Sequence, residues 1–341
     1  MYSFMNDYSE GAHPRVLELL IKSNLVQNAV YGEDVHSETA KEYIKKAIQK
    51  ENVDIHFIPG GTQTNLLVIS SFLRPHQCVI AANTGHINVH EAGAIEATGH
   101  KVVSVPSIDG KLTPDTIQAV LEYHSDEHMV QPKMIYISNS TELGTIYTKD
   151  ELMDIHSICR ANDLFLYLDG ARIGSALTCK INDLTLKEIA ELVDVFYIGG
   201  TKNGALLGEA LIICRDSFKK DFRHLIKQRG ALLAKGFVTG IQFEALFKDD
   251  LYFLLAAHAN EMAEKIVKTL EKGGFLFYAP PCTNQIFSIL PNDILKKLSK
   301  QFQYSIQEKV DEKHSAVRFV TSWATTLESV DKLNAFLKEN H

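Results

Sequence analysis

Short apolar segments that alternate with helical patterns constrain the fold of this chain more than any other feature. They read VDIHFI (53–58), CVIAA (78–82), KVVSVP (101–106), KMIYIS (133–138), LFLYLD (164–169), VDVFYI (193–198) and EALIIC (209–214). Such short apolar runs are typical of strands buried on both faces of a sheet. Helical patterns lie between them at 62–73, 87–97, 113–124 and 149–162. The sequence therefore predicts an α/β fold with a mostly parallel seven-stranded sheet flanked by helices.

The pattern changes after about residue 245. A long amphipathic helix is expected at 250–272, then short strands at 275–278, 285–290 and 316–321, and a last helix at 326–338. We therefore expect three parts: an N-terminal arm and helix (1–48), a large cofactor-binding domain (49–245) and a small α+β C-terminal domain (246–341).

Composition excludes several classes of protein. The net charge of −7 argues against a nucleic-acid-binding face. No run of about 18 apolar residues predicts a membrane span, and the first residues, MYSFMNDYSEGAHP, do not resemble a secretory signal. The five cysteines are scattered without a CxxC pair, which is typical of reduced thiols. We expect a cytoplasmic protein with a small-molecule ligand.

Residues that follow the predicted strands are candidates for the site, because ligands bind beyond the carboxyl ends of strands in open parallel sheets. Gly60, Gly61 and Thr62 open a helix whose free backbone N–H groups, with Thr62 as cap, suit a phosphate. A plain tight turn is the alternative. A Walker pattern is absent, which disfavours a nucleotide triphosphate.

His86 and His90, with Glu91 alongside, have the spacing of a helical metal pair. A third ligand is not obvious, so no metal is predicted. We favour His86 as an imidazole that stacks on a flat ligand.

Two further strand ends carry an aspartate and a lysine. Asp169 ends a buried strand, where a carboxylate is costly unless paired, so either Arg172 is its partner or it faces a cationic ring nitrogen. Lys202 lies in GGTKNG at the end of another buried strand, where desolvation would lower its pKa and free its amine. A phosphate loop, a stacking histidine, an aspartate and a lysine together match the needs of pyridoxal phosphate.

The chain resembles the threonine aldolase family, also called β-eliminating lyases, which are pyridoxal-phosphate enzymes of the aspartate-aminotransferase-like (type I) fold. The resemblance runs nearly end to end through NDYSEGAHP (6–14), VYGED (30–34), PGGTQTN (59–65), GHINVHEAGAIEATGHKV (85–102), STELGTIYTKDEL (140–152), LDGARIGSAL (168–177), GGTKNGALLGEA (199–210) and VRFVTSWAT (317–325). The DGAR and GGTKNGA blocks are the specific ones.

The resemblance implies roles toward the cofactor. Lys202 would form an imine with it, Asp169 would pair with its pyridinium nitrogen, and His86 would stack on its ring. Gly60, Gly61 and Thr62 would hold the phosphate, to which Thr201 can offer its hydroxyl.

The resemblance also implies residues toward the substrate and the neighbouring subunit. Arg172, beside the cofactor, and Arg318 would hold the substrate carboxylate through the bidentate fork of arginine. Tyr31 would border the pocket. Members of this family are homodimers or homotetramers with shared sites, so Lys235 would reach the phosphate of a neighbouring subunit.

Two blocks depart from the family pattern. Asn6, before Asp7, stands where many relatives carry a serine that touches the substrate carboxylate. The lysine block also differs from the SKGLGAP form of better-known aldolases. These two differences bear on the substrate rather than on the cofactor.

The implied reaction is aldol cleavage of L-threonine or L-allo-threonine to glycine and acetaldehyde. The general base stays open among His86, His128 and a bound water. Alternatives are a phenylserine-type aldolase, β-elimination or transamination on the same scaffold. Two alternatives belong to other classes of protein. One is a metal hydrolase that uses His86, His90 and Glu91, and the other is a non-catalytic α/β binding protein.

Overall fold

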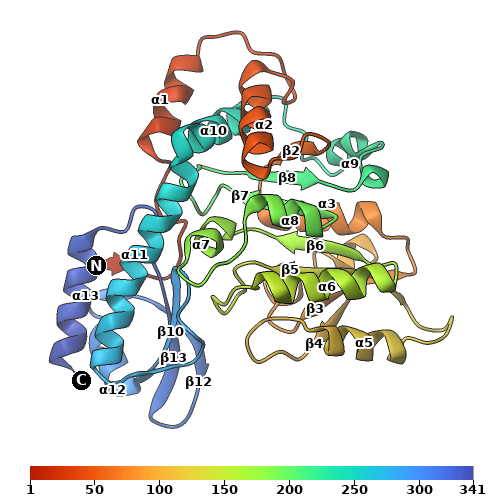
Figure 1. Ribbon diagram of the computed structural model, residues 1–341. Coiled ribbons are helices and arrows are strands. Elements are labelled where there is room, and N and C mark those ends of the chain that lie inside the picture. Colours follow the sequence, from red (N-terminus) through yellow and green to blue (C-terminus); the bar gives the residue numbers. More distant parts are fainter. Residues whose placement is uncertain (341) are drawn as a thin grey trace.

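A seven-stranded sheet forms the centre of the larger part of the molecule in the computed structural model, which describes residues 1–340 (Figure 1). The spatial order is β2-β8-β7-β6-β5-β3-β4. The strands are β2 (Asp54–Ile58), β3 (Gln77–Ala82), β4 (Lys101–Val105), β5 (Gln131–Ser138), β6 (Phe165–Asp169), β7 (Val195–Gly199) and β8 (Glu209–Ile213). Only β8 runs antiparallel to its two neighbours. The predicted seven-stranded, mostly parallel sheet is confirmed.

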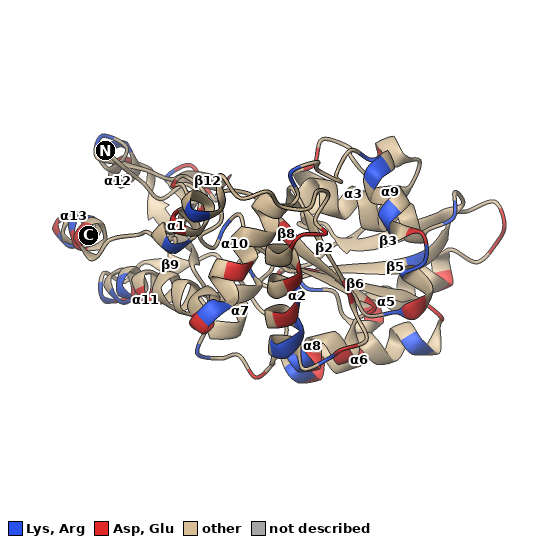
Figure 2. Ribbon diagram, turned by 90° about the horizontal axis from the view of Figure 1, so that it is seen from above, with Lys and Arg blue, Asp and Glu red and all other residues tan. Residues whose placement is uncertain are grey.

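Helices cover both faces of this sheet, as the buried strands require. Two separate hydrophobic cores result: one contains Ile44, Ile155 and Ile189 under α2, α6 and α8, and the other contains Leu67 and Phe222 under α3 and α9. The helices are α1 (Pro14–Ser23), α2 (Val35–Ile48), α3 (Gly61–Phe72), α4 (His86–Val89), α5 (Pro114–Tyr123), α6 (Lys149–Ala161), α7 (Ile173–Thr178), α8 (Leu186–Leu192), α9 (Phe222–Gln228) and α10 (Phe237–Phe247). Most charged residues lie on the helices and loops around the sheet (Figure 2).

One predicted helix of the larger part is wrong. The segment 87–97 was expected to be a single helix, but α4 ends at Val89 and only a 3-10 turn, Glu96–Thr98, follows. Ala92 and Gly93 have φ of 51° and 73°, which a continuous helix cannot contain. The break leaves Glu91 free to fold back toward His86.

The smaller part is built on the long helix α11 (Leu251–Lys272), close to its predicted bounds (Figure 1). Its sheet has the order β12-β13-β10-β9 and is antiparallel. The remaining elements are β9 (Leu276–Phe277), β10 (Gln285–Pro291), α12 (Asn292–Leu298), β11 (Phe302–Gln303), β12 (Ser305–Lys309), β13 (His314–Val320) and α13 (Leu327–Glu339). The sequence did not indicate β11, β12 or α12.

The first 48 residues contribute to both parts. The short strand β1 (Tyr2–Ser3) pairs in parallel with β11, and Phe4 lies in the core of the smaller part. Val16 and Ile44, on α1 and α2, instead join a core of the larger part. The chain therefore crosses between the two parts around residues 5–13.

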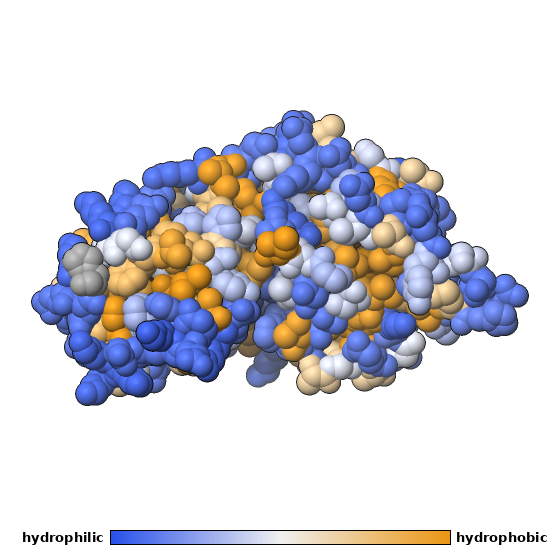
Figure 3. Space-filling model, turned by 90° about the horizontal axis from the view of Figure 1, so that it is seen from below, coloured by the Kyte–Doolittle hydropathy of each residue, from blue (hydrophilic) through white to orange (hydrophobic). Residues whose placement is uncertain are grey.

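The surface seen from below includes the edge strand β4 and helix α5. Hydrophobic residues are exposed on this face in both parts (Figure 3), and a groove there is lined by Val102, Val103 and Val120 together with Tyr123. Among residues 1–340 no helix is long and apolar enough to span a membrane.

Candidate active site

The ends of β6 and β7 come into direct contact. Gly199 N donates to Gly170 O at 3.0 Å. A Cβ on Gly170 would lie 1.9 Å from Tyr197 O, and one on Gly199 would lie 2.3 Å from Ala171 O. Only glycine fits at these two positions, so the DGAR and GGTKNG turns are held together beyond the carboxyl ends of their strands. This places Asp169 and Lys202 at one edge of the sheet.

Asp169 is buried and receives four hydrogen bonds. Tyr197 Oη donates to Oδ1 at 2.5 Å and Tyr136 Oη to Oδ2 at 2.6 Å. Ala171 N and Asn65 Nδ2 donate at 2.9 and 3.3 Å. Burial and the Asp169 charge raise the pKa of both tyrosines well above the ordinary value, so both remain donors. Arg172 is not the partner of Asp169, which corrects one of the two sequence interpretations.

Lys202 lies in the turn after β7, with its Nζ 6.0 Å from the ring centre of Tyr8. Burial, followed by the positive charge of Arg172, lowers its pKa, while Asp7, Asp169 and Glu209 oppose the shift. The lowered pKa favours the free amine, which is the nucleophilic form of lysine.

Glu209, on β8, fixes the turn that carries Lys202. Its Oε2 accepts from Gly200 N and its Oε1 from Thr201 Oγ1, both at 2.9 Å. Thr201 Oγ1 also accepts from Gly208 N at 3.0 Å. Burial raises the pKa of Glu209 to about 7. The Thr201 hydroxyl therefore donates its hydrogen bond to Glu209. The sequence had instead predicted that this hydroxyl would be available to a phosphate.

A cluster of charge lies next to Lys202. Arg172 forms a two-pronged ion pair with Asp7, with Nε and Nη2 at 2.7 and 3.0 Å from the two carboxylate oxygens. Asn284 Nδ2 donates to Asp7 as well, at 2.9 Å. Burial disfavours the Asp7 charge, but the cations Arg172 and Lys202 hold its pKa below the ordinary value. Asp7 is thus saturated by protein donors.

Arg318, on β13, enters the same cluster from the smaller part. Burial and the charge of Arg172 lower its pKa. Its Nη2 donates to Met5 O at 3.3 Å, and its buried Nε has no hydrogen-bond partner among residues 1–340. Two guanidinium groups with an unused buried donor make a site for an anion such as a carboxylate.

His86 stands at the start of α4, with its ring held by a buried acid. Nδ1 lies 2.7 Å from Glu91 Oε1, and Asn65 Nδ2 donates to the same oxygen at 2.6 Å. Asn65 also reaches Asp169, so a continuous hydrogen-bonded chain joins the histidine to the aspartate. The Glu91 contact assigns the proton to Nδ1 and leaves Nε2 as an acceptor.

The N-terminus of α3 supplies the remaining element of the site. Gly60 is the N-cap, without a side-chain cap hydrogen bond, so Thr62 is not the cap that the sequence predicted. The backbone N–H groups of Gly61 and Thr62 belong to the first turn, where no intrahelical partner exists. A helix start of this kind suits a phosphate. Gly61 adjoins Tyr197, because a Cβ there would lie 3.3 Å from the tyrosine oxygen.

Four predicted site residues lie elsewhere or in other roles. Asn6 uses its Oδ1 to accept from Tyr8 N and Ser9 Oγ within the arm. Tyr31 and Lys235 lie near each other, since Tyr31 N donates to Ala234 O, and Tyr31 borders a pocket beside β2. His128 is exposed in the turn before β5, at the amino edge of the sheet. Since the carboxyl edge carries Lys202, His128 of the same chain cannot reach it, and its selection as a base is corrected.

The metal alternative finds no support in the geometry. His86 and His90 have ring centres 5.5 Å apart, but Glu91 hydrogen-bonds His86 rather than facing a shared point with both. Among residues 1–340 no group of three or more His, Cys, Asp or Glu side chains is arranged to hold a metal ion.

Sequence reasoning missed five site residues: Asn65, Tyr136, Glu142, Tyr197 and Glu209. A signal was present for the tyrosines. Tyr136 and Tyr167 pair in register across β5 and β6. Tyr197 lies on β7 two residues beyond Val195, the partner of Tyr167. A phenol in each of three neighbouring buried strands requires buried polar partners, which are Asp169 for Tyr136 and Tyr197 and Asn65 for Tyr167.

The residues at this edge fit pyridoxal phosphate. Lys202 is a desolvated amine, Asp169 a buried carboxylate within reach of a ring nitrogen, and the start of α3 an anion site. The unpaired Nε of Arg318 marks a second anion site in the same cluster.

Comparison with known proteins agrees with the geometry. A sequence model of the β-eliminating lyase family matches residues 17–292. A low specificity L-threonine aldolase of a Pseudomonas species is 29% identical over 345 residues, 98% of this chain and 96% of that protein. The solved structure of Leishmania major threonine aldolase is 50% identical with a TM-score of 0.98 and covers 99% of both chains. A Thermus thermophilus aspartate aminotransferase, 14% identical, superposes with a TM-score of 0.74 over 99% of this chain and 91% of its own, which shows the fold alone.

The fold and the site define a pyridoxal-phosphate-dependent lyase that has the fold of aspartate aminotransferase. Within that class the chain belongs to the β-eliminating lyase family, to which the threonine aldolases also belong. The family resemblance, the fold class and the cofactor predicted from the sequence are thereby confirmed.

Proposed function

We propose that this protein cleaves β-hydroxy-α-amino acids, with L-threonine or L-allo-threonine as substrate, to glycine and an aldehyde. One observation carries the proposal: the buried amine of Lys202 lies close enough to the Asp169 carboxylate and the Arg172 guanidinium for their charges to act on it, and Arg172 in turn lies as close to Arg318. That arrangement suits a cofactor aldehyde on one side and an amino-acid carboxylate on the other. The names of the two aldolase relatives support the same reaction.

In this proposal the cofactor is held at three points. Lys202 attaches it covalently, Asp169 pairs with its ring nitrogen, and the start of α3 at Gly60, Gly61 and Thr62 binds its phosphate. The bound cofactor supplies an electron sink for the pair of a bond broken at Cα. Hydrogen bonds from Tyr136, Tyr197 and Asn65 would hold Asp169 in place toward the ring nitrogen. His86 would cover a face of the ring.

Orientation of the substrate decides which bond breaks. Arg318 and Arg172 would hold the substrate carboxylate and so set the rotation about Cα, which places the Cα–Cβ bond for cleavage. Arg172 is already ion-paired with Asp7. Arg318 has an Nε without a hydrogen-bond partner, so it is more available to the substrate carboxylate. Asn6, whose Oδ1 accepts hydrogen bonds from Tyr8 N and Ser9 Oγ, would fix the conformation of the arm beside the two arginines.

Neighbouring copies of the chain would complete the site. We propose a homodimer or homotetramer in which Tyr31 borders the pocket and Lys235 reaches the phosphate of another subunit. Within one chain the two residues lie near each other beside β2, and no hydrogen bond among residues 1–340 joins either of them to Lys202 or Asp169, which is consistent with a role across an interface. We also propose a cytoplasmic location, because all five cysteines are free.

Product analysis tests the function directly. The purified protein, supplied with pyridoxal phosphate, is incubated with L-threonine, L-allo-threonine or phenylserine, and glycine, aldehyde, pyruvate, ammonia and keto acids are measured. Glycine and aldehyde in equal amounts are the expected result. Pyruvate or another keto acid with ammonia would instead indicate β-elimination, the reaction for which the family is named, and a keto acid without released ammonia would indicate transamination.

A further inference from the structure

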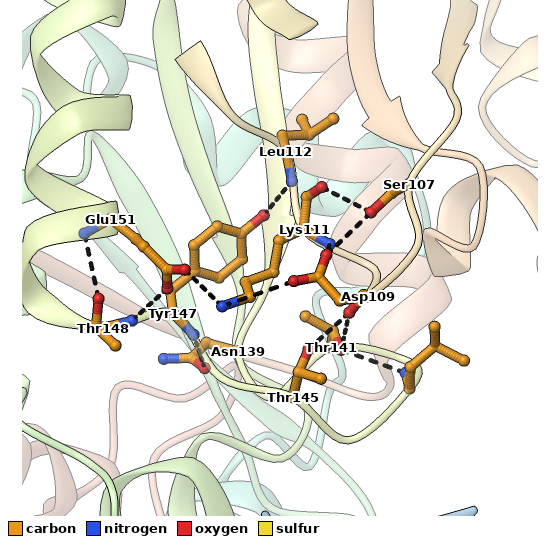
Figure 4. A network of polar contacts seen from close by, with 11 residues as sticks. Ser107, Asp109, Lys111, Leu112, Asn139, Thr141, Thr145, Tyr147, Thr148 and Glu151 are labelled. Carbon is orange, nitrogen blue, oxygen red and sulfur yellow. Dashed lines mark hydrogen bonds and ion pairs between the residues drawn. The ribbon is translucent and has the colours of Figure 1, made fainter. Parts of the chain in front are cut away.

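The loop between β5 and α6 is anchored on its outer side by a dense polar network (Figure 4). Thr145 Oγ1 donates to Asp109 O at 2.7 Å and lies 2.7 Å from Thr141 Oγ1. Tyr147 Oη accepts from Leu112 N at 2.7 Å. These contacts tie residues 141–147 to the segment that follows β4. The loop therefore has a fixed position at the carboxyl edge of the sheet.

The smaller part fixes the same loop from the other side. Thr283 Oγ1 donates to Gly144 O at 3.0 Å, and Gln285 Nε2 donates to Thr141 O at 3.2 Å. Gly144 has φ +78°, and a Cβ there would lie 2.9 Å from Gln285 O. Contacts on two sides make this loop a rigid support, and the side chain it carries into the site is Glu142.

Glu142 lies among the residues already assigned to the site. Its Oε1 accepts from Ser138 Oγ at 2.8 Å and from the backbone N–H of His86 at 2.9 Å. Within residues 1–340 no other residue donates a hydrogen bond to its Oε2, and the residue is partly exposed. A carboxylate with one anchored and one available oxygen can exchange a proton with a bound molecule.

We propose that Glu142 is a catalytic residue that accepts the proton of the substrate β-hydroxyl during the aldol cleavage proposed above. Oε2 takes the hydroxyl proton, and the electron pair of that O–H bond forms the carbonyl of the departing aldehyde. The pair of the broken Cα–Cβ bond stays with the glycine half, which then takes up one proton at Cα. In the synthetic direction the protonated Glu142 returns its proton to the new hydroxyl.

The electrostatic surroundings suit this role. Burial, followed by the charge of Asp169, raises the pKa of Glu142, which strengthens the carboxylate as a base. Tyr136 on β5, Asp169 on β6, Arg172 before α7 and His86 on α4 face it from the neighbouring elements. Of these, His86 is the competing base, but its ring is committed to Glu91 through Nδ1 and to the cofactor face.

Glu142→Gln tests the role, because the amide keeps the acceptor for Ser138 and His86 while it removes the base. We expect kcat for cleavage to fall about 10²-fold or more, the range for loss of a general base, with KM little changed. Glycine has no β-hydroxyl, so exchange of its Cα hydrogen with deuterated solvent, followed by NMR, should continue. The dissociation constant of glycine, measured by calorimetry, should also stay near that of the parent protein.

The pH profile supplies a second readout. In the parent protein cleavage should decline as the pH falls through the raised pKa of Glu142, because the protonated carboxyl cannot accept another proton. That decline should be absent from the residual activity of Glu142→Gln. Glu244→Gln is the matched control, since Glu244 is a partly buried carboxylate paired with His36 away from the site, and it should cleave at the parent rate.

Three outcomes would overturn the assignment. Cleavage by Glu142→Gln at the parent rate would return the base to His86 or a water. Equal losses in cleavage and glycine exchange would show that Glu142 only supports the site. Failure of the parent protein to form glycine and aldehyde would contradict the proposed function itself, and this role with it.

Discussion

The two ends of the site differ in how completely their charged groups are hydrogen-bonded. Asp169, at the end assigned to the cofactor ring, receives four donors from strands and a helix of the larger part. Arg318, at the end assigned to the substrate, makes one long hydrogen bond and buries an unpaired Nε. The first end is held in place by many hydrogen bonds in the free chain, whereas the second retains an unpaired donor for a substrate that binds and leaves.

Removal of the lysine should have the largest effect. Lys202→Ala deletes the buried amine assigned to the cofactor aldehyde, so covalent attachment of the cofactor and turnover should both be lost. Visible absorption of the protein, and mass spectrometry after borohydride reduction, measure attachment. Lys180→Ala, at an exposed lysine paired with Glu264, is the control and should behave like the parent. Release of glycine by Lys202→Ala at the parent rate would refute the site assignment.

The substrate end should give the next largest effect. Arg318→Leu should weaken substrate binding by about 2–5 kcal/mol, the cost of truncating one partner of a buried charge pair, with the cofactor retained. Its thermal stability should change little, because Arg318 makes few contacts. Arg172→Leu should lose stability as well, since it leaves Asp7 buried without its ion pair. An unchanged KM for Arg318→Leu would place carboxylate binding elsewhere.

The smallest effect is expected from one donor at the cofactor end. Tyr197→Phe removes one of the four hydrogen bonds to Asp169, and a hydrogen bond to a charged group contributes about 1.5–3 kcal/mol. Cofactor affinity, measured by fluorescence titration, should fall accordingly. Tyr278→Phe, which removes a hydrogen bond to the exposed Glu308, should leave it unchanged. Equal cofactor affinities for the two variants would mean that the Tyr197 hydrogen bond to Asp169 does not contribute to cofactor binding.

The larger sheet was predictable because each of its strands is a compact apolar segment between helical patterns. The strands β11 and β12 were not, since SIQEK at 305–309 is mostly exposed and lacks an apolar run. The helix expected at 87–97 failed because local propensity does not reveal the left-handed backbone at Ala92 and Gly93. The three-part division of the chain stays a prediction.

Prediction of the site was best where a residue ends a strand. Asp169 and Lys202 could be found because the position of a strand end follows from the sequence. Glu142 could not, since its loop is placed by contacts with residues 109–112 and 283–285, far away in the chain. His128, one of the bases left open from the sequence, lies before the amino end of β5, at the opposite edge of the sheet.

The amino terminus deserves care in any practical work with this protein. Tyr2 and Ser3 pair with β11, Met5 O holds Arg318, and Asp7 holds Arg172. An affinity tag fused before Met1 would be attached to a segment whose first seven residues include Met5 and Asp7, which contact the two arginines of the substrate end. A tag after α13 would hang on a helix of the smaller part that contributes none of these contacts. Kinetic comparisons among variants are therefore best made with carboxyl-terminal tags or with the tag removed.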